Sequence, residues 1–278
     1  MSTQNFHAQL EQVIDETAVR QTAEDIAQEN TVFRTAFRSI QVPERTGDTY
    51  EIPVPEDKLG EPTEREPGAE FDYGREEYRT ETIERAEYSS GSRITEQEMQ
   101  DNSFDLLEDH ITRHSQKMAE KLDIEAFSVL SAAAPAANTA GSDNGDDMTF
   151  DDVIDGLEVL EGREGGYEGD TLFVGTNAKN GIIRDLASRG TDLGDNVVTS
   201  AGIVANYAGV DIAFSNNNLL TNNDAILVDT DFFGYEGEWT GVSTDQEDDF
   251  DTRSTKLQIF WEGGWTATQS GAAVRVRG

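Results

Sequence analysis

The clearest periodic pattern in the sequence runs over residues 94–133, where apolar side chains recur at helical spacing. Thr95 opens this segment and Glu98 follows three residues later, which is the arrangement of a capping box at a helix N-terminus. The pattern stops in SAAAPAAN, at Pro135, because proline interrupts a helix. We therefore predict one long amphipathic helix with a stripe formed by Phe104, Leu107, Ile111, Met118, Leu122, Phe127 and Leu130.

Shorter helices and strands are predicted downstream. After Thr149, a plausible cap, a second helix places these residues inside: Phe150, Val153, Ile154, Leu157 and Leu160. Buried strands are expected at 171–176 and 225–230, a third helix at 177–190, and strand-like segments at 195–199 and 202–215. The chain ends in alternating strands, in which Leu257, Ile259 and Trp261 share a face. This order of elements predicts an α+β fold.

The N-terminal segment and the region after it have different patterns. Residues 5–29 show a thin apolar stripe at helical spacing, so we expect an arm whose short helix needs a partner surface. Residues 44–90 are rich in proline and charge, with period-2 stretches on both sides of the prolines. They predict a two-stranded extension with an irregular tip at Lys58, Leu59 and Gly60. An isolated hairpin is marginally stable in water, so the extension needs a neighbouring subunit; the alternative is a disordered linker.

Composition adds a statement about solvent. The chain has 56 acidic against 21 basic residues, a net charge of −35. Repulsion between so many like charges opposes compaction. Concentrated salt screens this repulsion, because the Debye length at 1 M salt is only about 3 Å. The lysines are few (Lys58, Lys117, Lys121, Lys179 and Lys256), and a carboxylate-rich, lysine-poor surface is typical of proteins from salt-in halophiles. Disorder is the alternative, but 36% hydrophobic residues and three tryptophans favour a packed core.

The sequence offers little catalytic chemistry. Cysteine is absent, and no phosphate loop, HExxH, GxSxG or GxGxxG motif is present, so no enzymatic activity is expected. The acidity argues against a nucleic-acid binder, and neither a signal peptide nor a membrane span is evident. His110 and His114 have a metal-ligand spacing without a third ligand, which favours structural histidines.

Two acidic runs are candidate Ca²⁺ or Mg²⁺ sites, because these ions prefer oxygen ligands. The first contains Asp245, Asp248, Asp249 and Asp251, together with Glu247. The second contains Asp143, Asn144, Asp146 and Asp147. A solvated, salt-adapted face is the simpler interpretation of both.

The ordered set of elements resembles the major capsid proteins of tailed viruses, which share the Hong Kong 97 fold. ITEQEMQDNSFDLLEDHITRHSQKMAEKLDIEAFSVL is similar to the spine helix, and TFDDVIDGLEVLEGREGGYEGDTLFVGTNAKNGIIRDL to the helix, strand and helix of the axial domain. The stretch GIVANYAGVDIAFS matches a further family pattern through Gly202, Gly209, Val210 and Ser215.

The resemblance implies a division of the chain and a lattice-forming role. The expected parts are an N-terminal arm (1–43), an extended loop (44–90), a peripheral domain with the spine helix (91–142), an axial domain (143–232) and returning peripheral strands (233–278). It implies self-assembly into hexamers and pentamers of an icosahedral shell around double-stranded DNA, with the loop lying across a neighbouring subunit. With the composition, this indicates a virion protein of a tailed virus of haloarchaea, assembled in the host cytoplasm.

The resemblance also implies partners and alternatives. A portal, a separate scaffold or maturation protease, and decoration or turret proteins are expected, with no membrane and no cofactor except Ca²⁺ or Mg²⁺ at acidic subunit contacts. Crosslinking of Lys58 to an asparagine among 216–218 and 222–223 is not expected. Arg20, Arg34 and Arg38 either face DNA or pair with acids. The competing functions are an encapsulin-type nanocompartment shell, a halophilic enzyme, and a surface or tail protein.

Overall fold

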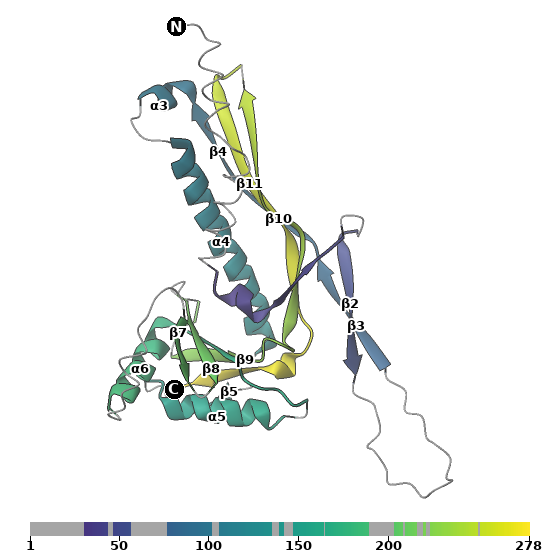
Figure 1. Cartoon of the computed structure of the whole chain (residues 1–278), viewed down its shortest axis with the longest axis vertical. Coiled ribbons are helices and arrows are strands. Elements are labelled where there is room, and N and C mark those ends of the chain that lie inside the picture. Colours follow the sequence, from purple (N-terminus) through teal and green to yellow (C-terminus); the bar gives the residue numbers. More distant parts are fainter. Residues whose placement is uncertain are drawn as a thin grey trace, which may run out of the picture.

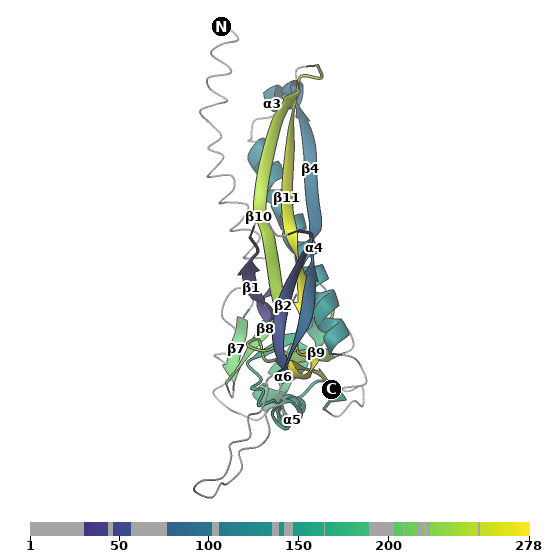
Figure 2. The ribbon, with the colours of Figure 1, turned by 90° about the vertical axis from the view of Figure 1, so that its right-hand side faces the viewer.

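The computed structural model describes an elongated molecule with a long sheet at one end, a compact sandwich at the other, and a projecting two-stranded ribbon (Figures 1 and 2). Among the described residues, no helix is long and apolar enough to cross a membrane. The residues described are 31–43, 47–56, 77–101, 106–134, 139–141, 147–163, 165–188, 203–207, 209–215, 219–220, 223–249 and 251–278.

The long sheet has four strands in the order β1 (Arg38–Gln41), β10 (Gly234–Asp249), β11 (Ser254–Ala267) and β4 (Ala86–Thr95). Helix α4 (Leu106–Ala133) lies along one face of it (Figure 1). The predicted helical stripe and the predicted strand alternation meet here, because Ile111, Met118 and Leu122 of α4 pack against Leu257, Ile259 and Trp261 of β11. We call this sheet with α4 the peripheral region.

The predicted capping box is confirmed, although the helix is described in two pieces. The Thr95 backbone N–H donates to Glu98 Oε2 at 2.9 Å, and the Glu98 N–H donates to Thr95 Oγ1 at 3.3 Å. Helix α3 (Glu96–Asp101) starts there, and α4 starts at Leu106. Residues 94 and 95 themselves belong to β4, because they pair with β11. Residues 102–105, including Phe104, lie outside the described residues.

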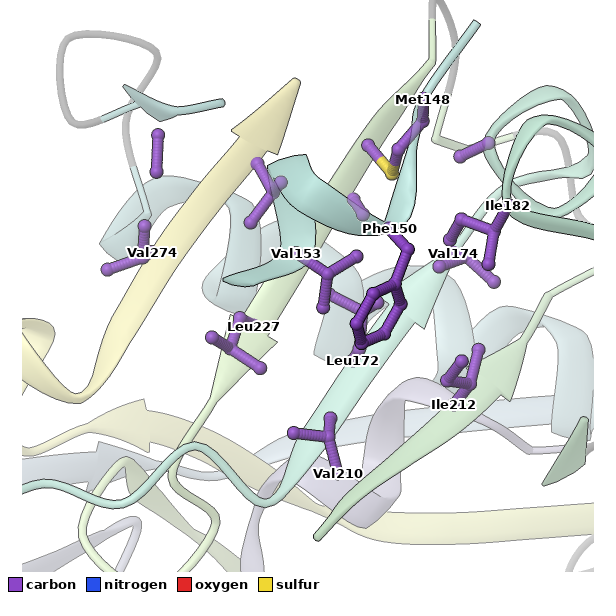
Figure 3. Close-up of a cluster of buried hydrophobic side chains, with 14 of the residues drawn as sticks. Met148, Phe150, Val153, Leu172, Val174, Ile182, Val210, Ile212, Leu227 and Val274 are labelled. Atoms are coloured by element: carbon purple, nitrogen blue, oxygen red, sulfur yellow. The ribbon is translucent and has the colours of Figure 1, made fainter. Parts of the chain in front are cut away.

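The compact end is a six-stranded sheet covered on both faces, which we call the axial sandwich. Its strands, in spatial order, are β5 (Thr139–Ala140), β12 (Ala273–Arg277), β9 (Asp224–Val228), β6 (Thr171–Val174), β8 (Val210–Phe214) and β7 (Ile203–Tyr207). Helices α5 (Phe150–Glu161) and α6 (Thr176–Ser188) cover one face, where Leu172, Val174 and Leu227 meet Val153 and Ile182 (Figure 3).

The opposite face of this sheet packs against the end of α4 and the short helix η1 (Phe33–Ala36). Alternate strand residues point this way, so Phe173 and Ile226 meet Leu130 and Phe33. A second short helix, η3 (Ser270–Ala272), precedes β12. The turn between β7 and β8 uses Gly209, whose φ of +90° is readily adopted by glycine.

The structure corrects three details of the sequence interpretation. Residues 233–278 are not all peripheral, because β12 pairs with β9 and β5 in the axial sheet. The segment up to residue 43 is not wholly an arm, because Phe33 and Phe37 are buried against the axial sandwich. Ile154 was expected inside α5 but is 45% exposed, since the inward stripe contains Val153 and Leu160 instead. The predicted cap at Thr149 is confirmed as a capping box with Asp152.

Some predicted elements fall outside the described residues. These are the arm helix at 5–29, the strand at 195–199, the last two residues of the helix at 177–190, and Gly202. The other domain boundaries stay predictions.

Candidate assembly site

The feature that projects furthest from both sheets is a ribbon made of β2 (Thr49–Glu56) and β3 (Glu77–Glu84) (Figure 1). Their antiparallel register confirms the predicted two-stranded extension. Residues opposite each other in such a ladder share a face. The inner face contains Tyr50, Ile52, Val54, Arg79, Glu81 and Ile83. The outer face contains Thr49, Glu51, Pro53, Pro55, Tyr78, Thr80, Thr82 and Glu84.

The root of the ribbon packs on its own chain through the inner face. Ile52, Val54 and Ile83 are buried in a cluster with Val42 and Trp239. The indole N–H of Trp239 also donates to the Gly47 carbonyl, just before β2, at 3.1 Å. The expectation that the extension is ordered only by a neighbouring subunit is therefore wrong for its root, since its apolar residues are buried within one subunit.

Ile83 fits a recess that exists because glycines lie opposite each other in the β10–β11 ladder. Gly237 pairs with Gly264. A Cβ at Gly237 would lie 3.0 Å from Ile83 Cδ1, and one at Gly264 would lie 2.2 Å from the Glu84 carbonyl oxygen and 3.1 Å from Ile83 Cγ2. The ribbon can approach this closely only where side chains are missing. We call this recess the glycine socket; it is formed by Gly237 and Gly264 and is filled by Ile83.

Polar contacts hold the ribbon on either side of the socket. Arg79 donates to the Thr268 carbonyl near the axial sandwich, and its Nε lies 3.2 Å from Glu81 Oε1. Arg85, directly after β3, pairs with Glu262 of β11. The Arg85 backbone N–H donates to the Asp48 carbonyl at 2.8 Å, which closes the root. The inner face is thus held to the body from its root to Arg79.

The outer face has a different chemistry. Pro53, Pro55, Tyr78, Thr80 and Thr82 are all exposed, and Tyr78 has the largest exposed fraction, 58%, among the exposed large hydrophobic residues described. None of these five side chains is charged at neutral pH. The acids on this face, Glu51 and Glu84, lie towards the root.

The segment that precedes β1 is fixed to the spine helix by a buried carboxylate. Asp123 Oδ1 of α4 accepts hydrogen bonds from the backbone N–H groups of Val32 at 2.8 Å and Phe33 at 2.6 Å. Burial raises the pKa of Asp123, and these backbone donors oppose that rise. Phe33 packs on Phe127 and Phe173, with ring centroids 4.8 and 5.5 Å away.

The sequence left two roles open for Arg20, Arg34 and Arg38, which were to face DNA or pair with acids. The two that the structure describes pair with acids. Arg34 forms an ion pair with the buried Glu236, and Arg38 pairs with Asp231. Burial raises the pKa of Glu236, and Arg34 opposes the effect. Arg20 lies outside the described residues.

The two histidines join the spine helix to the neighbouring strand. His114 Nδ1 hydrogen-bonds with Ser90 Oγ at 2.7 Å, and His110 Nδ1 with Ser92 Oγ at 2.9 Å. The rings are 6.2 Å apart. Burial lowers the pKa of His114, and the charges of His110 and Lys117 act in the same direction. These contacts agree with the prediction that both histidines have a structural role.

The acidic run near the end of β10 is not gathered into a cluster. Asp248 accepts a hydrogen bond from Thr255 Oγ1 at 2.8 Å, whereas Asp249 lies 3.3 Å from Arg93 and 3.4 Å from Lys256. The side-chain hydrogen bond of Thr252 is the largest cause that lowers the pKa of Asp249, and the Thr252 backbone and Lys256 act in the same direction. Within the described part of the chain, no three His, Cys, Asp or Glu residues form a group that could hold a metal ion, with Asp245 and Asp251 included.

Other predicted site residues lie outside the described residues. They are the tip residues Lys58, Leu59 and Gly60, the asparagines 216–218 and 222, and residues 143–146. Asp147 of the second acidic run is described and pairs with Arg184 at 2.7 Å.

Comparison with known proteins identifies the family. The family model described as phage capsid protein matches residues 77–276, which is most of the chain. This chain belongs to the phage capsid protein family. No curated protein sequence matches this capsid protein.

Solved structures of similar fold extend the comparison. The capsid of cyanophage P-SCSP1u is 13% identical, with a TM-score of 0.66 over 88% of this chain and 87% of that chain. A protein of Microbacterium phage Oxtober96 is 16% identical, with a TM-score of 0.62 over 89% and 90%. The virus-like particle protein of Pyrococcus furiosus is 11% identical, with a TM-score of 0.61 over 95% and 100%. The predicted Hong Kong 97-type α+β fold of this capsid protein is confirmed.

The sequence interpretation missed the glycine socket and the role of Asp123. Glycines in the interior of a predicted strand signal a bulge or a close backbone approach, so the pair at 263–264 was a usable signal. An aspartate on the buried side of a helix, beside Leu122, was another.

Proposed function

We propose that this capsid protein is the major shell subunit of a tailed virus that infects a halophilic archaeon, assembling into hexamers and pentamers around double-stranded DNA. The observation that carries the proposal is the ribbon. It is held to its own body on one face and presents the other face to the outside, where the two cross-strand pairs furthest from the root, Pro53–Thr80 and Pro55–Tyr78, are uncharged. A monomeric protein has little use for such a projection, whereas a shell subunit can place it on the next copy.

Family membership and fold support the shell role, and composition supports the halophilic host. A net charge of −35 on each copy makes association of many copies unfavourable in dilute buffer. Concentrated salt screens that repulsion between exposed charges. Divalent cations at acidic contacts between copies would act in the same direction. We also propose as partners a portal, a scaffold or maturation protease, and decoration or turret proteins.

The experiment is assembly of the purified full chain at different salt concentrations. We expect closed particles by electron microscopy at molar salt, and dissociated subunits after dialysis into millimolar salt without divalent cations. Particles that stay intact in millimolar salt would overturn the salt-dependent part of the proposal. A protein that stays monomeric at every salt concentration would overturn the shell role itself.

A second candidate is the shell of a protein nanocompartment of the encapsulin type. The similarity to the Pyrococcus furiosus virus-like particle protein, which spans the whole of that chain, supports this second candidate. Particles isolated from the native source distinguish the two. Packaged double-stranded DNA supports the virus, and an enclosed enzyme supports the nanocompartment.

A further inference from the structure

We propose that the exposed side of α4 is the surface of the subunit that contacts double-stranded DNA inside the shell, through Arg113, Lys117 and Lys121. The proposal rests on the proposed function, which places DNA within the shell, and adds which surface of the subunit the DNA meets. We call these three residues the cationic stripe.

The cationic stripe follows the side of α4 that does not pack on the peripheral sheet. Its members are four residues apart, so they lie on successive turns, about 6 Å from one to the next. All three are exposed, and the exposed fractions of the Arg113 and Lys121 side chains are 72% and 50%. The stripe therefore presents three positive charges in a row to whatever lies against the helix.

The sequence around the stripe departs from the composition of the chain. Residues 110–119 contain Arg113, Lys117 and two histidines but no acidic residue. Because 56 of the 278 residues are acidic, a stretch of this length with average composition would contain about two. Lys117 and Lys121 are also two of only five lysines in the chain. Positive charge is thus gathered on one helix of a very acidic protein.

The local partners leave this charge available to an anion. Arg113 lies 3.0 Å from Asp109, and Lys121 pairs with Glu125, both at i,i+4 spacing on the exposed surface. Pairs of this kind contribute little, so a phosphate can replace the carboxylate. Among the described residues, Lys117 has no acidic partner. After burial and His110, its charge is a further cause that lowers the pKa of His114.

The opposite side of the peripheral sheet has a different charge pattern. Figure 1 shows α4 on one side of this sheet and the ribbon on the other. Lys256 of β11 points to the ribbon side, because the next residue, Leu257, packs against α4. Lys256 lies 3.5 Å from Glu247 and 3.4 Å from Asp249, and Asp249 also pairs with Arg93. Cations are matched by carboxylates there, so that side is the less suitable one for DNA.

The net charge of −35 does not prevent a local contact in concentrated salt. At 1 M salt the Debye length is about 3 Å, so only charges in direct contact with a phosphate act on it. One strand of DNA offers a phosphate every 3.4 Å or so along the axis. The three cations span about 12 Å and can each meet one. Phosphate contacts carry no sequence information, so the stripe suits DNA of any sequence.

The test compares the lysines of the natural chain in particles purified from the native source at molar salt. The particles are treated with a small amine-reactive reagent, once with their DNA and once after DNA release and nuclease digestion. We expect Lys117 to react several-fold less in the DNA-filled particles. Lys256 is the matched control, since it is an exposed lysine on the other side of the sheet, and should react equally in both.

A crosslinking measurement separates contact from general shielding by the DNA. DNA-filled particles are treated with formaldehyde and digested with nuclease and protease. Mass spectrometry should then find nucleotides attached at Lys117 or Lys121 and none at Lys256. Attachment at Lys256 alone would overturn the inference.

Two variants test whether the charge itself matters. Lys117→Glu should reduce the proportion of DNA-filled particles several-fold, because it places a carboxylate against phosphate. Lys117→Arg keeps the charge and should fill normally. Thermal unfolding of the dissociated subunits should change little in both, since Lys117 is exposed. Normal filling of Lys117→Glu would contradict the proposal.

The outcomes separate this inference from the proposed function. Equal reactivity of Lys117 in the two preparations would overturn the inference and leave the shell function standing. This holds whether the lysine is uncovered in both or covered in both by a protein segment. Particles that enclose a protein and no DNA would instead overturn the DNA-enclosing function, and the inference would fail with it.

Discussion

In the axial sandwich both faces of the sheet are covered by helices, whereas α4 covers one face of the peripheral sheet and the root of the ribbon covers only part of the other. The axial strand β9 is buried along its whole length. In β4, by contrast, Glu87, Ser89 and Arg93 face away from α4 and are exposed. Within the described residues, the core of the axial sheet is thus enclosed on both faces by one subunit, whereas the peripheral sheet leaves a row of exposed side chains on the face opposite α4. The difference suggests that stability depends mainly on the first region and assembly on the second.

The largest expected effect comes from the core of the axial sandwich. Phe173→Ala removes a fully buried ring that contacts Phe33, so we expect the free energy of unfolding to fall by about 3–5 kcal/mol. Phe232→Ala is the matched control, since that ring is 47% exposed and should cost about 1 kcal/mol or less. Chemical denaturation at fixed molar salt measures both. Equal losses would contradict the assignment of stability to the axial core.

The next effect concerns the glycine socket. Gly264→Ala places a methyl group 2.2 Å from the Glu84 carbonyl oxygen, so the ribbon must move and we expect a loss of about 1–3 kcal/mol. Assembly measured by light scattering should fall more than this loss of stability explains, because the outer face is redirected. Gly47→Ala, also at the ribbon root, meets nothing within 4 Å and should behave normally. An assembly-competent Gly264→Ala subunit would show that the socket does not set the ribbon direction.

A smaller, pH-dependent effect is expected where α4 meets β4. The folded-state pKa of His114 is lowered from 6.5 by burial and by the nearby His110 and Lys117. As pH falls, His114 therefore takes up a proton in the unfolded chain before it does so in the folded chain. The contribution of neutral His114 to stability is fully present above pH 6.5 and is lost as pH falls through the folded-state pKa. The free energy of unfolding, measured across this pH window, should therefore increase with pH, and His114→Gln should make this increase smaller. An unchanged slope in the variant would assign the effect to other groups.

The smallest effect is expected at an exposed ion pair on α4. Lys121 and Glu125 pair at i,i+4 spacing, and Lys121 also lies 5.8 Å from the Tyr88 ring centre. Lys121→Gln should cost about 0.3–0.5 kcal/mol in dilute salt and less at molar salt, because exposed pairs are screened. Denaturation at two salt concentrations measures the difference. A loss that grows with salt would contradict an electrostatic origin.

Elements governed by local periodicity could be predicted from the sequence. The stripe of α4, the alternation of β11 and both capping boxes follow from residues close together in the chain, and all appear in the structure. Features that depend on contacts between distant segments could not be predicted. The return of β12 to the axial sheet and the burial of Ile83 against Gly264 join segments far apart in sequence. The same limit applies to the inner face of the ribbon. It packs on Trp239 of β10 and Gly264 of β11, and no local sequence pattern connects these residues to it.

The most direct test of the shell function is a cryo-electron microscopy reconstruction of particles assembled from the full chain at molar salt. We predict closed particles with rings of five and six copies. Discrete dimers, open aggregates or monomers under all salt conditions would contradict the proposed function.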